Sequence, residues 1–145
     1  MLHYITLGSN DLSRSRKFYD AVFAPLGFIC HVVHDDEIGY GPASAQPTAR
    51  QCRLWILSPY LKLPATWGNR TLVALTAETR SKVDNFHEAA MRHGGIDEGK
   101  PGIRPFTENF YSAYVRDPDG NKLSAVCEAA EEPSGTSVRE AFAAC

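Results

Sequence analysis

The sequence has little excess charge of either sign and no long apolar run. It carries 15 basic and 17 acidic side chains among 145 residues, a formal net charge of −2 at pH 7. Without an excess of positive charge to neutralise a phosphate backbone, we expect no nucleic-acid partner. No apolar stretch approaches the roughly 18 residues that span a bilayer, so no membrane partner is expected. The first residues lack the basic and apolar regions of a secretion signal, which predicts a cytoplasmic protein.

Cysteine is scarce, and its spacing indicates no metal-binding or redox motif. The four residues are Cys30, Cys52, Cys127 and Cys145, and no two of them form a CxxC pair or a zinc-knuckle spacing. The sequence also lacks dinucleotide-binding, P-loop and GxSxG motifs. What is present is a composition of 43% hydrophobic and 22% charged residues, which is typical of one globular domain.

The most informative feature that is present is an internal repeat at an offset of 68 residues. Identical residues meet at this offset without a gap: Leu7 and Leu75, Ser13 and Ser81, Phe18 and Phe86, Ala21 and Ala89, and Gly27 and Gly95. The signals for secondary structure repeat with the residues. The chain is therefore expected to contain two copies of one structural unit.

Each copy is predicted to contain a strand, a helix and three further strands. The first helix is expected to begin at Asn10 or Asp11 and to end at Gly27, and the second to begin at Thr79 or Ser81 and to end at Gly94 and Gly95. The strands are expected at 4–7, 28–34, 37–41 and 52–57, and then at 72–75, 96–100, 110–116 and 122–127. This βαβββ pattern, present twice, predicts an α+β fold.

The segments between and after the two copies are expected to be irregular. Residues 58–69 contain two prolines and a glycine and are interpreted as the connector. Residues 129–145 are interpreted as a tail, with a possible short helix at 138–144. The Asp117-Pro118-Asp119-Gly120 sequence predicts a tight hairpin turn, in which both carboxylates hold the turn's own backbone and do not form a catalytic pair.

The paired βαβββ units, the opening Tyr4-Ile5-Thr6-Leu7-Gly8 and the turn from Arg116 to Asn121 resemble the vicinal oxygen chelate superfamily. That group includes glyoxalase I, bleomycin-resistance proteins, fosfomycin-resistance enzymes and extradiol dioxygenases. The resemblance covers residues 1–128 as a single domain, with modules at about 1–60 and 70–128. It implies that the modules form a cupped mixed sheet with the helices on its outer face. It also implies a homodimer, because members commonly pair.

In that superfamily, His, Gln or Glu side chains from the first and last strands of each unit hold a divalent ion in the cup. The resemblance places these positions at Tyr4, Leu72, Ser124 and, by the repeat offset, near Ile56. A phenol, two aliphatic side chains and a hydroxyl are not usual ligands of a divalent ion. We therefore predict no metal and no other cofactor, unless ligands are displaced from the usual positions, beginning with His3. The polar run from His34 to Glu37 is interpreted as a solvated turn.

Strand alternation predicts which side chains line the cup that remains. They are Tyr4, Thr6, Leu72, Ala74, Ser112, Tyr114, Ser124 and Val126, with Trp55 and Arg104 at the rim and Arg53, Trp67 and Tyr40 as further rim candidates. Two tyrosines, several hydroxyls and apolar walls suit a small, partly aromatic organic ligand. An arginine at the rim would pair with a carboxylate.

Three functions stay open from the sequence. The main prediction is a glyoxalase/bleomycin-resistance-like protein with a degenerate metal site that binds a small molecule in the cup. The enzymatic alternative is a metal-dependent lyase of the lactoylglutathione lyase type, or a dioxygenase, with displaced ligands. In the third, Tyr4 and Tyr114 hydrogen-bond across a filled cup and the chain is a dimerisation or interaction module. No catalytic residue is assigned.

Overall fold

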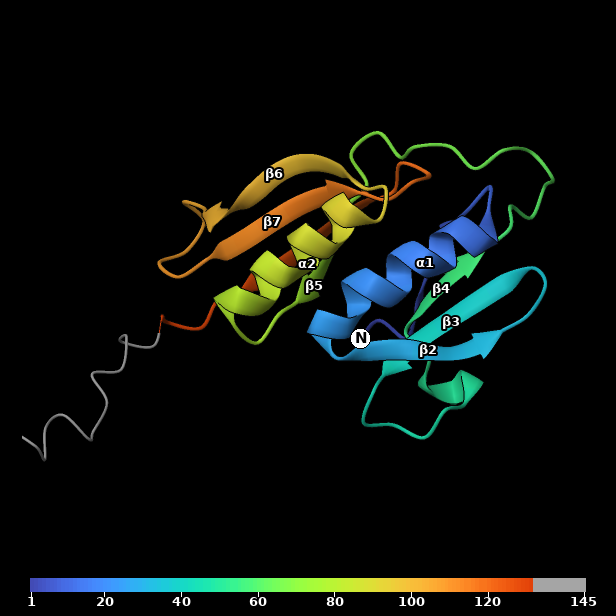
Figure 1. Ribbon diagram of the computed structural model, residues 1–145, viewed down its shortest axis with the longest axis horizontal. Coiled ribbons are helices and arrows are strands. Elements are labelled where there is room, and N and C mark those ends of the chain that lie inside the picture. Colours follow the sequence, from blue (N-terminus) through green and yellow to red (C-terminus); the bar gives the residue numbers. More distant parts are fainter. Residues whose placement is uncertain (132–145) are drawn as a thin grey trace, which may run out of the picture.

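The computed structural model describes residues 1–131, which form two four-stranded sheets that each carry one helix (Figure 1). The first module contains β1 (Ile5–Gly8), α1 (Leu12–Phe23), β2 (Phe28–Val33), β3 (Glu37–Pro42) and β4 (Leu54–Leu57). The second contains β5 (Val73–Thr76), α2 (Arg80–Arg92), β6 (Ile96–Ile103), β7 (Tyr111–Arg116) and β8 (Lys122–Cys127). The predicted α+β fold with two βαβββ units is confirmed. The possible helix at 138–144 lies outside the described residues.

Both sheets have the same strand order, and both are mixed sheets with parallel and antiparallel neighbours. The orders are β1-β4-β3-β2 and β5-β8-β7-β6. In each module the first strand is parallel to the last, and the other neighbours are antiparallel. The strand β6 extends to Ile103, three residues beyond the predicted range, and its pairing with β7 is interrupted on both sides of Gly99.

The helix ends follow local signals in the sequence. The side chain of Asp11 accepts a hydrogen bond from the backbone nitrogen of Arg14, and Thr79 caps α2 in the same way. The first α-helix stops at Phe23, before the predicted end, because the next three residues tighten into a 3-10 turn. That turn ends at Gly27, whose φ of 78° lies in the left-handed region that glycine adopts without strain.

The two helices lie side by side on one face of the sheets (Figure 1). Their apolar faces are fully buried against the strands, with Phe18 and Val22 on α1 and Val83 and Phe86 on α2. Burying this apolar surface is the main force that holds helices to sheets. The opposite face of each sheet carries no helix, and it is the face on which a cup was predicted.

The hairpin turn between β7 and β8 is held by the Asp117 carboxylate, as predicted. Its Oδ1 accepts hydrogen bonds from the backbone nitrogens of Asp119 at 2.9 Å and Asn121 at 2.8 Å. Its Oδ2 accepts a hydrogen bond from the hydroxyl of Tyr19 on α1 at 2.5 Å. Burial, reinforced by this carboxylate, raises the pKa of Tyr19 well above its ordinary value, so the hydroxyl stays a donor.

The carboxylate of Asp119 serves a different purpose from the predicted one. It is 1% exposed and points into the first module. Its Oδ1 accepts hydrogen bonds from the backbone nitrogen of Asn10 at 2.9 Å and from Arg14 Nη2 at 2.8 Å. Its Oδ2 accepts a third from the hydroxyl of Ser15 at 3.1 Å. The prediction that it holds its own turn was wrong, because its partners lie more than a hundred residues away in sequence.

Replacing Asp119 with alanine is expected to lower the free energy of unfolding by about 2–4 kcal/mol, because three donors lose a charged acceptor and one of them, the Ser15 hydroxyl, is fully buried. Chemical denaturation monitored by circular dichroism measures the loss. Glu108→Ala is the control, since Glu108 is an exposed acid. An equal and small effect of both variants would contradict the structural role of Asp119.

Candidate functional site

On the helix-free face of the first module, side chains surround a hollow of about 290 Å³. Its lining consists of Tyr4, Thr6, Glu37, Trp55 and Leu57. Tyr4 is 56% exposed. The hollow is thus aromatic, carries one acid and opens to solvent.

The matching face of the second module carries a larger hollow, of about 510 Å³. Its lining consists of Arg70, Thr71, Leu72, Tyr114, Arg116 and Lys122. Leu72 is 41% exposed, so this hollow is also open. Its lining is basic where that of the first module is aromatic and acidic.

A third hollow, of about 220 Å³, lies between the two modules. Thr6 lines this hollow and the aromatic one, while Thr71 and Lys122 line this hollow and the basic one. The three hollows therefore adjoin. We call them together the groove, with an aromatic end at Trp55 and a basic end at Lys122.

The other predicted lining residues share the groove face of the second module, but not all of them are accessible. Ala74 is exposed, Val126 is half-buried, and Ser112 and Ser124 are fully buried. The hydroxyls of the two serines have no hydrogen-bond partner among residues 1–131. In the sheet, Ser124 lies directly beside Tyr114.

Arg104, which was predicted at the rim, lies over Tyr114. Its guanidinium carbon is 5.4 Å from the centre of the tyrosine ring, and Nη2 donates a hydrogen bond to the carbonyl of Ser112 at 3.2 Å. The ring also packs closely on the backbone of β6, since a Cβ added at Gly99 would stand 2.8 Å from Tyr114 Cδ2. A glycine is needed there for steric reasons.

The two tyrosines do not close the cup. Tyr4 lines the aromatic end of the groove and Tyr114 the basic end, and no hydrogen bond joins them in the described chain. The filled-cup alternative depended on such a contact. Within a single chain, the space between them is open.

Tyr40 is not at the rim, and that prediction was wrong. It is fully buried, and its hydroxyl donates a hydrogen bond to Asp20 Oδ1 on α1 at 2.8 Å. Burial raises the pKa of Tyr40 far above its ordinary value. The cause is strand alternation: Tyr40 pairs with Leu54 on the helix face, which leaves Gly39 on the groove face.

Ile56 does not occupy the fourth metal-ligand position, where the resemblance had placed it. It is fully buried on the helix face. In the sheets, Thr6 pairs with Trp55 as Ala74 pairs with Ser124, so Trp55 takes the matching place. Matching residues are 68 positions apart in the first strands of the two modules, as for Thr6 and Ala74, but 69 apart in the last strands, as for Trp55 and Ser124. An offset of 68 therefore pointed to the neighbouring residue, whose side chain faces the other side of the sheet.

Trp67 and Arg53 were also rim candidates, and the structure separates them. Trp67 packs on Gly120 and on the guanidinium of Arg116, whose carbon is 4.8 Å from the ring centre. Arg53 lines a separate apolar pocket with His3. Neither side chain therefore lines the groove.

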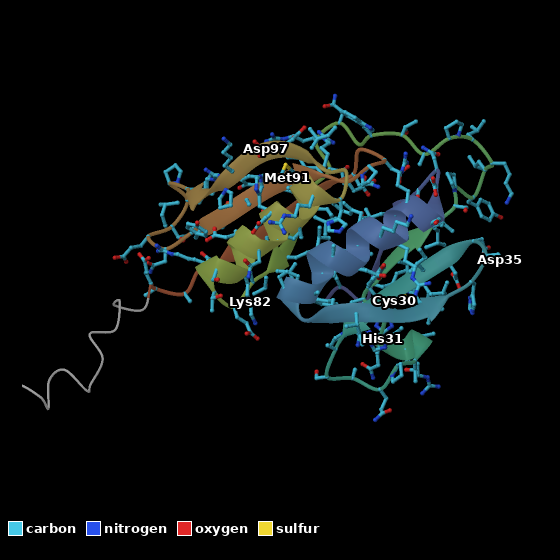
Figure 2. All side chains as sticks on the ribbon, viewed as in Figure 1. Cys30, His31, Asp35, Lys82, Met91 and Asp97 are labelled. Carbon is cyan, nitrogen blue, oxygen red and sulfur yellow. The ribbon has the colours of Figure 1, made fainter. Side chains whose placement is uncertain are left out.

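The positions implied for a metal do not fit a divalent ion. They carry Tyr4, Trp55, Leu72 and Ser124, which offer hydroxyls but no imidazole or carboxylate. Within residues 1–131, no group of three or more His, Cys, Asp or Glu side chains is arranged to hold an ion. The predicted polar turn is exposed, and Asp35 lies at the tip of the hairpin between β2 and β3 (Figure 2).

The sequence analysis missed a polar pair between a buried histidine and an exposed aspartate. His87 on α2 is 9% exposed, and its Nε2 lies 2.9 Å from Asp97 Oδ1 on β6. The same oxygen accepts a hydrogen bond from the backbone nitrogen of Gly99 at 3.0 Å. Figure 2 shows Asp97 beside the end of α2 that carries Met91. No spacing signal could have found the pair, because the chain reverses direction between the two residues.

Two βαβββ modules, with a groove on the face opposite their helices, define the class of protein. The sequence model of the Glyoxalase/Bleomycin resistance protein/Dioxygenase superfamily matches residues 1–124, so the chain belongs to this superfamily. The predicted resemblance is thereby confirmed. A search of curated proteins finds no match.

Solved structures show the same fold. A glyoxalase/bleomycin resistance protein from Albidiferax ferrireducens T118 is 34% identical, with a TM-score of 0.74, over 87% of this chain and 97% of that one. A glyoxalase-related enzyme from Fulvimarina pelagi is 20% identical, with a TM-score of 0.67, over 88% and 87% of the chains. The fosfomycin resistance protein FosX from Listeria monocytogenes is 16% identical, with a TM-score of 0.63, over 89% and 93%.

Replacing Asp97 with asparagine is expected to lower the melting temperature near neutral pH. The hydrogen bonds from His87 and from the Gly99 backbone hold the pKa of Asp97 below its usual range. A carboxylate with a lowered folded-state pKa contributes stability above its unfolded-state pKa of about 3.9, and loses it as the pH falls through the folded-state value. The gap between the variant and the original protein should therefore narrow below about pH 4.

Thermal melts followed by fluorescence across this pH range make the measurement. Asp35→Asn is the matched control, since Asp35 is an exposed aspartate at a hairpin tip. A gap that stays constant with pH, or that is equally large for the control, would contradict the role given to the Asp97 carboxylate.

Proposed function

We propose that the protein binds a small organic molecule in the groove and does so without a resident metal ion. The observation that carries the proposal is the groove itself, which joins both modules through shared lining residues and leaves Tyr4 and Leu72 exposed. Concave sites with apolar walls and a few polar groups are the usual places for such ligands. Membership of the superfamily supports the fold and not a reaction, because one fold hosts many activities.

The enzymatic alternative, a lyase or dioxygenase, requires displaced ligands, beginning with His3. The neighbours of His3 argue against it. His3 lines an apolar pocket with Leu2, Ile5 and Phe23, and the cation Arg53 also lines this pocket. A single imidazole beside a guanidinium does not make a site for a divalent cation.

The absence of a resident metal is tested by elemental analysis of protein purified without an affinity tag. We expect metal far below one ion per chain, and no saturating rise in melting temperature with Zn²⁺, Ni²⁺, Mn²⁺ or Fe²⁺, because the groove lining offers a single carboxylate, Glu37, and no imidazole. Stoichiometric metal, or a rise that saturates at one ion per chain, would overturn this part of the proposal.

Binding in the groove is tested by blocking its centre. Thr6 is exposed and lines two of the three hollows, so Thr6→Trp should fill the junction between them and abolish binding of small aromatic compounds found by ligand-observed NMR. Tryptophan is well tolerated in strands, so the fold should survive. Ser13→Trp, at an exposed position on α1, is the control. Undiminished binding to the Thr6 variant would place the ligand elsewhere.

The remaining expectations stay predictions. We propose a homodimer, which would cover large exposed side chains such as Tyr4, Trp67 and Leu72. Across the described part of the chain, every helix is too short or too polar to traverse a bilayer. We also propose a cytoplasmic location.

A further inference from the structure

We infer that the ligand is an organic oxyanion, a carboxylate or a phosphate, whose charged group binds at the basic end of the groove. This inference rests on the proposed function and adds the chemical class of the ligand. The chain as a whole is slightly acidic, with a net charge of −2. The basic end nevertheless brings together Arg70, Arg116 and Lys122, with Arg104 close behind on the ring of Tyr114.

One acid compensates part of this charge. Glu98 accepts hydrogen bonds from Arg116 Nε at 2.8 Å through Oε1, and its Oε2 lies 2.8 Å from Lys122 Nζ. These hydrogen bonds hold the pKa of Glu98 below its usual range, so it is ionised near neutral pH. One carboxylate against four cations leaves the basic end with a positive balance.

Arg70 has no ion-pair partner in the described chain and is exposed at the edge of the hollow. Its backbone φ of 103° lies where residues with side chains are rarely found. Such conformations cost free energy and concentrate at ligand-binding segments. An unpaired guanidinium in this position is available for an incoming anion.

Tyr114 lies among these cations with its polar end unused. The ring centre is 5.7 Å from Lys122 Nζ, and its hydroxyl makes no hydrogen bond to any described residue. Ser124 is adjacent in the sheet, but its hydroxyl is fully buried and does not reach the hollow. The Tyr114 hydroxyl, a donor next to cations, suits an oxyanion, because hydrogen bonds to a charged group are stronger than neutral ones.

The opposite end of the groove specifies the rest of the ligand. Trp55 presents a half-buried indole, and Tyr4 a largely exposed ring. Both offer flat apolar surface for an apolar or aromatic part. Glu37 lies at the same end and disfavours a second anionic group there. The groove therefore favours a molecule with one anionic end and one aromatic end.

The test uses matched probes that differ in charge. A panel of aromatic acids is titrated beside the corresponding amides by calorimetry, with naphthylacetate against naphthylacetamide as the first pair and naphthyl phosphate as the phosphate member. We expect the acids or the phosphate to bind at least about tenfold more tightly than the amides, and the preference to shrink with added salt. The relative affinities of the two anions distinguish a carboxylate site from a phosphate site.

Two variants make the test specific to the basic end. Arg70→Gln should weaken anion binding about tenfold and leave amide binding unchanged, whereas Arg50→Gln, at an exposed arginine of the first module, should change neither. Glu98→Gln should strengthen anion binding severalfold, because it removes the competing carboxylate. A purely structural role for Glu98 would instead predict weaker or unchanged binding.

The outcomes separate this inference from the proposed function. Equal affinity for acids and amides, lost from both in Thr6→Trp, would overturn the anion class while the proposed groove binding stands. If the affinity for the acids is unchanged in both Arg70→Gln and Glu98→Gln, the anion class is also overturned. If no member of the panel binds at all, both the anion class and the proposed function fail.

Discussion

The buried carboxylate of Asp119 is the contact on which the arrangement of the two modules depends. It accepts hydrogen bonds from the start of α1, while Asn121 in the same turn donates to the carbonyl of Gly8 at 2.9 Å. A buried carboxylate is tolerated only where donors surround it, so this turn fits one position against the first module. The groove follows from that position, because its central hollow lies at the join and includes Asn121.

Membership of the superfamily accounts for the paired βαβββ modules and leaves the chemistry to a few side chains. The positions that the family resemblance implies for metal ligands carry Tyr4, Leu72 and Ser124, and Trp55 lies at the place in the first sheet that matches Ser124 in the second. These side chains offer apolar surface and hydroxyls on the groove face. Side chains on this face can vary without disturbing the core, because the helices pack on the other side of the sheets.

At the basic end of the groove, the same cations link neighbouring strands and line the hollow. Arg116 and Lys122 bind Glu98 across the sheet and also line the hollow. One carboxylate shared between two cations compensates only part of their positive charge. The bulged strand β6 brings Gly99 beneath Tyr114, which lets the ring lie close to the sheet beside these cations.

The sequence by itself determined the secondary structure, the repeat and the family, because these depend on local spacing, caps and turn residues. It also predicted the groove face of most strands, since alternation is a local property. It placed Tyr40 and Ile56 wrongly, because each depends on the register between strands distant in sequence. The contacts of Asp119 and the cation cluster around Tyr114 were decided by tertiary structure alone, since they join residues that only the packing of helices and sheets brings together.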